Sequence, residues 1–352
     1  MGSESSARVK TLALDSDPGF TEQSIVQTAF HRLALIAAIV AFAVIVLGAY
    51  VRLSHAGLGC PDWPGCYGKL SWPVAAQAVE EANQAFPERP LDSEKAWKEM
   101  VHRYLAGALV MLVLGLNFLS WKSANRQAGL RVLSAILLVL ILFQAALGMW
   151  TVTLKLWPIV VLSHLMGGLA TFGMLLWLVH RSGFSAPSQA LVRIRPLIVT
   201  GLFVLVIQLA LGGWTSANYS ALACPDFPTC QGEMWPDSDF REGFIVWREI
   251  GVDYEGGVLD LPSRVAIHMT HRTGALFVFI ILGWLALRLI RNTETQAGGY
   301  VLGTLLVAQV TLGILNILLY LPLPNAVAHN GVGALLLAMM IWLLHGSTPQ
   351  RA

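Results

Sequence analysis

Long apolar stretches separated by polar segments dominate the chain. Eight of them run for about 20 residues, the length that an α-helix needs to cross ~30 Å of hydrocarbon. They lie at 33–53, 100–121, 131–151, 159–180, 196–215, 265–287, 299–321 and 325–345. This pattern predicts an all-α integral membrane protein with eight transmembrane helices, surrounded by the lipid bilayer.

Composition supports this class. Of the 352 residues, 55% are hydrophobic and 12% are charged, which is far from the average of soluble proteins. The net charge is only +2, and no Lys/Arg-rich run or glycine-rich phosphate loop appears. The sequence therefore predicts no nucleic-acid partner.

The distribution of charge predicts the orientation. If the N-terminus is cytoplasmic, the short connections on that side hold more Lys and Arg than Asp and Glu, and two long loops on the other side are acidic. This satisfies the positive-inside rule. Residues 1–30 show no cleavable signal peptide, so we expect a cytoplasmic tail there and a second one at 347–352.

The chain contains an internal repeat. Gly48 and Gly212 each lie twelve residues before a cysteine, and the motifs "QAALG" (144–148) and "QVTLG" (309–313) match further along. We predict two parallel four-helix units related by a pseudo-two-fold axis along the membrane normal. The predicted units are 31–181, with an outer loop at 54–98, and 196–346, with an outer loop at 216–263, joined by a cytoplasmic linker at 182–195.

Four histidines occupy matched places in the repeat. His102 corresponds to His271 and His164 to His329, and all four lie near the outer ends of even-numbered spans. An ionisable residue inside a span is a functional candidate, and facing imidazoles in a helical bundle are typical ligands of haem iron. A single histidine near a helix end is more often interfacial, but four at matched depth favour one bis-histidine haem site per half.

Other readings of the histidines are less favoured. Neither half offers three or four ligands close together in sequence, which argues against zinc or copper. His31, His180 and His345 lie at cytoplasmic ends of spans and are interpreted as membrane-boundary residues. The role of His55, just before the first cysteine pair, stays open.

Two cysteine pairs share one spacing, in "CPDWPGC" (60–66) and "CPDFPTC" (224–230). The spacing is neither a zinc knuckle nor a covalent haem-attachment motif. On an outer, oxidising face it favours the disulfides Cys60–Cys66 and Cys224–Cys230. A structural and a redox-active role are both open.

In combination these motifs resemble the haem A synthase family. The match rests on the duplicated cysteine loop, on "EMVHR" (99–103) with its copy "HMTHR" (268–272), and on "SHLMGG" (163–168) with "AHNGVG" (328–333). It covers nearly all of 31–345 and points to members with a cysteine pair in both halves. The resemblance implies a bacterial inner-membrane enzyme that oxidises haem O to haem A for cytochrome oxidase.

The family also implies roles for individual residues. One half holds the substrate haem and the other a permanent haem b, each between two histidines. Glu99 matches the catalytic carboxylate, whereas the second half has His268 there. We therefore expect His102 and His164 to bind the substrate and His271 and His329 to bind haem b. Arg103 and Arg272, each next to one of these histidines, are candidate partners of haem propionates, with snorkelling to the membrane interface as the open alternative.

The resemblance further implies oxygen drawn from water through successive hydroxylations of a methyl group. It also implies a haem O synthase and other assembly factors of cytochrome oxidase as partners. Whether the protein forms a homo-oligomer stays open. Two alternatives use the same histidines. A quinone-linked di-haem b electron carrier would need no Glu99, and a haem-handling assembly factor or transporter would need no redox cycle.

Overall fold

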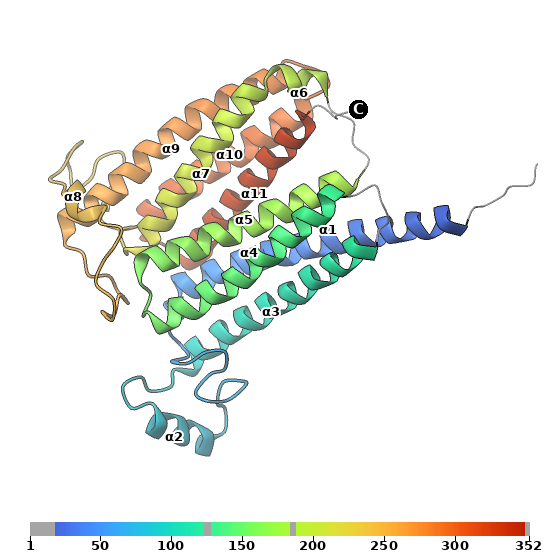
Figure 1. Cartoon of the computed structure of the whole chain (residues 1–352). Coiled ribbons are helices and arrows are strands. Elements are labelled where there is room, and N and C mark those ends of the chain that lie inside the picture. The colour runs from blue at the N-terminus through green and yellow to red at the C-terminus, as the bar shows by residue number, and fades with distance from the viewer. Residues whose placement is uncertain (1–17, 123–127, 184–187, 349–352) are drawn as a thin grey trace, which may run out of the picture.

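Long helices account for most of the chain in the computed structural model, which describes residues 18–122, 128–183 and 188–348 (Figure 1). Eight of the helices in these ranges are long and apolar enough to cross a membrane, which confirms the predicted spans. They are α1 (Pro18–Leu53), α3 (Ser93–Lys122), α4 (Ala128–Thr153), α5 (Pro158–Ser182), α7 (Arg195–Ala217), α9 (Leu261–Ile290), α10 (Gln296–Leu318) and α11 (Leu323–Gly346). The short helices are α2 (Ala76–Ala85), α6 (Gln189–Arg193) and α8 (Phe240–Gly243).

Several helices begin earlier than their apolar stretches. The carboxylate of Asp260 accepts a hydrogen bond from Ser263 N at 3.0 Å and caps α9, and Asp92 does the same for Lys95 N at 3.2 Å where α3 begins. Such capped first turns are polar, so hydropathy does not detect them. The predicted loop at 54–98 consequently ends inside α3. Helix α1 likewise begins within the predicted tail 1–30, of which residues 1–17 lie outside the described residues.

The two halves repeat the same packing. In the first, α1 packs on α3 and α5, and α4 packs on α3 and α5. The second half repeats this with α7, α9, α10 and α11. The halves meet through the pairs α1 with α11, α5 with α7, and α5 with α11. Exchanging the halves maps this set of pairs onto itself, which fits the predicted pseudo-two-fold arrangement.

Residues at equivalent positions also meet between the halves. Arg52 Nη2 donates a hydrogen bond to the carbonyl oxygen of its counterpart Ser216 at 2.6 Å. The ring of His55 stacks on that of its counterpart Tyr219, with 5.8 Å between centroids. At the other end of the bundle, the ring centroids of His180 and its counterpart His345 lie 5.4 Å apart. Three such self-pairings are what a two-fold axis running between the halves would produce.

Both cysteine loops lie at one end of the bundle, where Figure 1 shows α2 and α8, while α6 lies at the opposite end. The loops also contact each other. Arg89 in the first loop pairs with Asp253 at 2.8 Å and with Glu255 at 3.0 Å in the second. Tyr254, between those acids, is buried in an apolar cluster with Trp157 of the first half. These contacts tie the outer ends of the two halves together.

Close helix packing depends on small residues. Along α1, Ala34, Ala37 and Ala41 recur at helical spacing and are at most 2% exposed, as is common where transmembrane helices approach closely. Gly299 of α10 is another contact of this kind. A Cβ atom there would come within 2.7 Å of Ile290 N and 2.9 Å of Ala286 O on α9.

We therefore expect Gly299→Ala to destabilise the bundle, because backbone atoms of α9 cannot yield as a flexible side chain could. Overpacking of this kind costs about 1–3 kcal/mol. Thermal unfolding in detergent micelles measures the effect. Gly303→Ala is the matched control on the same helix, since its Cβ would meet nothing closer than 3.9 Å. Equal melting temperatures for the two variants would contradict this account of the packing.

Candidate functional site

The two cysteine loops are built alike. Each is closed by a disulfide, Cys60–Cys66 or Cys224–Cys230, with Cα atoms 4.8 and 4.5 Å apart. Inside each loop an aspartate accepts hydrogen bonds from the backbone beyond the second cysteine: Asp62 from Tyr67 N at 2.6 Å, and Asp226 from Gln231 N at 2.6 Å. Hydrogen bonds led by that of the Thr229 hydroxyl lower the pKa of Asp226 from its usual range.

A buried side chain on the second long helix of each half anchors the loop. Glu99 on α3 accepts a hydrogen bond from Cys60 N through Oε2 at 2.9 Å. His268 on α9 accepts one from Cys224 N through Nδ1 at 3.3 Å. Glu99 and His268 are both 4% exposed. The position thus has one structural role in both halves, whatever chemistry Glu99 adds to it.

The arginine one turn further on completes this anchor. Arg103 forms an ion pair with Glu99 and donates to the carbonyl oxygen of Asp62 at 2.9 Å. Nε of Arg272 lies 3.3 Å from His268 Nε2, and the guanidinium donates to the carbonyl oxygens of Thr229 and Asp226 at 2.8 and 2.7 Å. Both guanidinium groups therefore fasten a disulfide loop to a helix. Their predicted role as propionate partners stays a prediction.

Each of the four histidines lies against a glycine of a neighbouring helix. A Cβ atom on Gly48 of α1 would come within 2.9 Å of the His102 ring, and one on Gly148 of α4 within 3.4 Å of the His164 ring. The second half repeats the contacts: 3.0 Å from Gly212 to His271 and 3.2 Å from Gly313 to His329. We call these four glycines the histidine seats. The sequence shows these glycines as matched positions of the repeat, but it gives no sign that they contact the imidazole rings.

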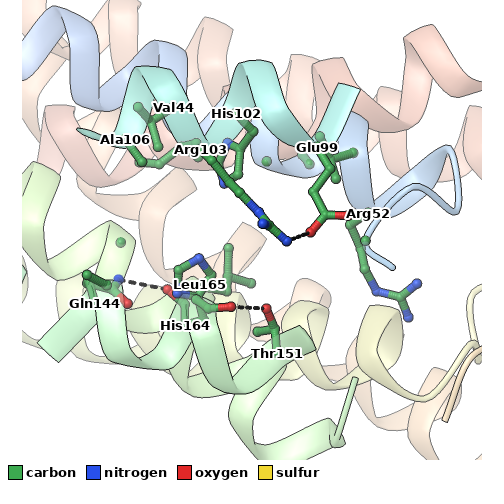
Figure 2. A pocket seen from close by; sticks show the side chains of 18 of the residues that line it. Val44, Arg52, Glu99, His102, Arg103, Ala106, Gln144, Thr151, His164 and Leu165 are labelled. Carbon is green, nitrogen blue, oxygen red and sulfur yellow. Dashed lines mark hydrogen bonds and ion pairs between the residues drawn. The ribbon is translucent and has the colours of Figure 1, made fainter. Parts of the chain in front are cut away.

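A cavity of about 730 Å³ lies between the helices of the first half, within the usual range of small-molecule sites. Figure 2 shows His102 and His164 on opposite walls of it, with Glu99 and Arg103 on the same helix as His102. Its lining is mainly apolar. Residues of the second half, among them Ser216, reach it across the interface.

The histidines of the two halves differ in their hydrogen bonds. In the first half, Nδ1 of His102 and Nδ1 of His164 are buried without a partner. In the second half, Nδ1 of His271 lies 3.0 Å from Gln208 Nε2, and Nδ1 of His329 lies 3.1 Å from the carbonyl oxygen of Gln309. The other ring nitrogen of His329, Nε2, lies 3.3 Å from the side-chain amide nitrogen of Gln309, so both nitrogens of this ring face one glutamine.

These features fit a haem in the first half. Buried polar atoms without partners are uncommon in proteins, so unpartnered imidazoles facing each other across a cavity suit an iron-centred ligand, and the seats leave room for each ring. The alternative of a multi-ligand metal site finds no support. Within 18–122, 128–183 and 188–348, no three His, Cys, Asp or Glu side chains gather to hold a metal ion.

A membrane bundle with duplicated pairs of facing histidines is typical of proteins that bind haem between transmembrane helices. The chain belongs to the family described as cytochrome oxidase assembly protein, whose model matches residues 31–341.

Individual relatives carry a more specific name. A protein named "Heme A synthase" from Shewanella oneidensis is 45% identical over 301 residues, covering 85% of this chain and 90% of the relative. Proteins of the same name from Novosphingobium aromaticivorans and Rhizorhabdus wittichii are 28% and 25% identical, covering 90% and 89% of this chain and 94% and 92% of the relatives.

We expect Gly48→Ala to weaken haem binding in the first half by up to ~10-fold. The added Cβ must displace the His102 ring by a few tenths of an ångström, a strain of about 1 kcal/mol. Titrating haem into the purified protein and following the absorbance of the bound form measures the affinity. Gly283→Ala is the control, because its Cβ would meet nothing closer than 3.9 Å. An unchanged haem affinity in Gly48→Ala would show that haem binding in the first half does not require a glycine at this position.

Proposed function

We propose that the protein is a haem A synthase, which oxidises a methyl group of haem O to a formyl group. The observation that carries the proposal is the cavity of the first half, which brings two histidines and a buried carboxylate, Glu99, to one apolar chamber. The family and the names of the relatives support the same activity.

The difference between the halves supports a division of labour. His102 and His164, which border the cavity and have no partner at Nδ1, would hold the substrate haem O. His271 and His329, whose rings are already held by Gln208 and Gln309, would keep a permanent haem b. A bound haem b supplies one-electron redox chemistry. At the position of Gln208, the first half has Val44, which cannot form such a hydrogen bond.

The reaction needs water and a base. In the first hydroxylation, the methyl group and one water would give a hydroxymethyl group, with two protons released and two electrons passed to an external oxidant. In the second, another water gives a gem-diol with the same losses, and the gem-diol releases water to leave the formyl group. Glu99 would accept a proton from the attacking water. A carboxylate offers about four lone-pair sites that can accept hydrogen bonds. Cys60 N and Arg103 use only some of those on Glu99.

One observation favours a different role for Glu99. His268 accepts a hydrogen bond from the equivalent cysteine nitrogen and lies against the equivalent arginine. Glu99 could therefore be only a loop anchor, as a di-haem b electron carrier would require. Exchanging the residue types between the halves separates these roles.

We expect Glu99→His to preserve the fold and the haem b content while conversion of haem O to haem A falls by at least ~100-fold, as loss of a general base does. Glu99→Gln, which keeps an acceptor for Cys60 N, should lose conversion similarly. Chromatography of the pigments extracted from purified protein measures haem O, haem A and haem b together. Full conversion by Glu99→His, the natural residue of the second half, would make Glu99 an anchor without catalytic function.

The proposal also includes the membrane location of the protein and its partners. Both cysteine loops lie at one end of the bundle, and Arg181, Arg193 and Arg195 gather on the connection at the other end. This supports a bacterial inner-membrane protein with cytoplasmic termini, outward-facing disulfide loops, and four-helix halves at 31–181 and 196–346. A haem O synthase would supply the substrate, and factors assembling cytochrome oxidase would take the product.

A further inference from the structure

We propose that Arg52 binds a propionate carboxylate of the substrate haem, an assignment that rests on the proposed function of the first half. Arg52 lies in the last turn of α1 and lines the cavity. Its Nε is buried and has no hydrogen-bond partner. A buried, unpartnered donor on a cationic group is costly unless a ligand satisfies it.

The second half holds the guanidinium of Arg52 in place. Nη2 donates to the carbonyl oxygen of Ser216 at 2.6 Å, and Cζ lies 4.1 Å from the centre of the Tyr219 ring. Neither contact neutralises the positive charge, and no carboxylate of the described residues forms an ion pair with Arg52. The side chain is thus oriented in advance while Nε–H stays available for an anion.

Charge complementarity identifies the ligand group. Haem carries two propionates at one edge of its ring, and an arginine–carboxylate pair forms charge-assisted, often bidentate hydrogen bonds. Arg103, the other arginine of the cavity, is directed to Glu99 (Figure 2) and to the loop carbonyls. Arg52 is consequently the better placed of the two cations to receive a ligand carboxylate.

The position along the helix agrees with this assignment. Arg52 lies four residues, and so about 6 Å, beyond the seat of the His102 ring at Gly48. A macrocycle centred between His102 and His164 would then turn its propionate edge toward the outer end of the bundle. Because the counterpart of Arg52 in the second half is the neutral Ser216, this contact distinguishes the substrate site from the haem b site.

Esterifying the propionates tests the contact directly. Haem O and its dimethyl ester, in which both carboxylates are neutral, are titrated into the purified full-length protein with its resident haem, and binding is followed by absorbance. The wild type should bind haem O at least ~10-fold more tightly than the ester, as expected for hydrogen bonds to a charged group. Arg52→Gln should bind both with similar affinity, and Arg52→Lys should keep part of the preference.

The control is Arg288→Gln, which removes an exposed arginine that also lies over an aromatic ring, 5.8 Å from Trp284. It should keep the wild-type preference. The proposal is overturned if Arg52→Gln keeps that preference, or if it weakens haem O and the ester equally, as loss of a purely structural tie to Ser216 would. A wild type that binds haem O without preferring it over the ester refutes the propionate contact alone. A wild type that binds no haem O refutes the proposed function as well.

Discussion

The contact between each histidine ring and its glycine seat is the constraint on which the rest of the site depends. An imidazole projecting from a transmembrane helix needs room beside the neighbouring helix, and an added Cβ would come within 2.9–3.2 Å of the ring at Gly48, Gly212 and Gly313 and within 3.4 Å at Gly148. The four contacts occupy matched places in the two four-helix units. The outer loops are then fastened above the rings through the next turn of the same helices, by Glu99 with Arg103 and by His268 with Arg272.

Against this shared frame, small differences between the halves define their chemistry. The first half places a carboxylate where the second has an imidazole, a valine where the second has Gln208, and an arginine where the second has Ser216. Of these changes, the arginine suits an anionic substrate, the carboxylate can serve as a base, and the valine leaves the His102 ring without the hydrogen bond that Gln208 gives His271. The second half instead holds its histidines by hydrogen bonds. If the proposed function holds, duplication followed by such divergence gave one reactive and one electron-handling site without a new fold.

Much of this could be predicted from the sequence, because the signals are strong and local. Runs of apolar residues mark the eight spans, and matched cysteines and histidines reveal the repeat and the pairing of His102 with His164. Helix starts such as Ser93 were missed because polar capping turns precede the apolar runs. Arg103 was interpreted as a propionate partner from its place beside His102, whereas its bonds to loop carbonyls depend on how the loop folds back. Arg52 and Gln208 belong to no motif, and only contacts between helices distant in sequence show what they face.

The haem content of the purified wild-type protein tests the central claim most directly. Extracted pigments are separated by chromatography and quantified per polypeptide after expression in cells that make haem O. The account predicts about one haem b and, in addition, haem O or haem A. Haem b alone at two per chain would indicate an electron carrier, and protein without haem would indicate a transport or assembly role. Either result would contradict the division between a substrate half and a haem b half.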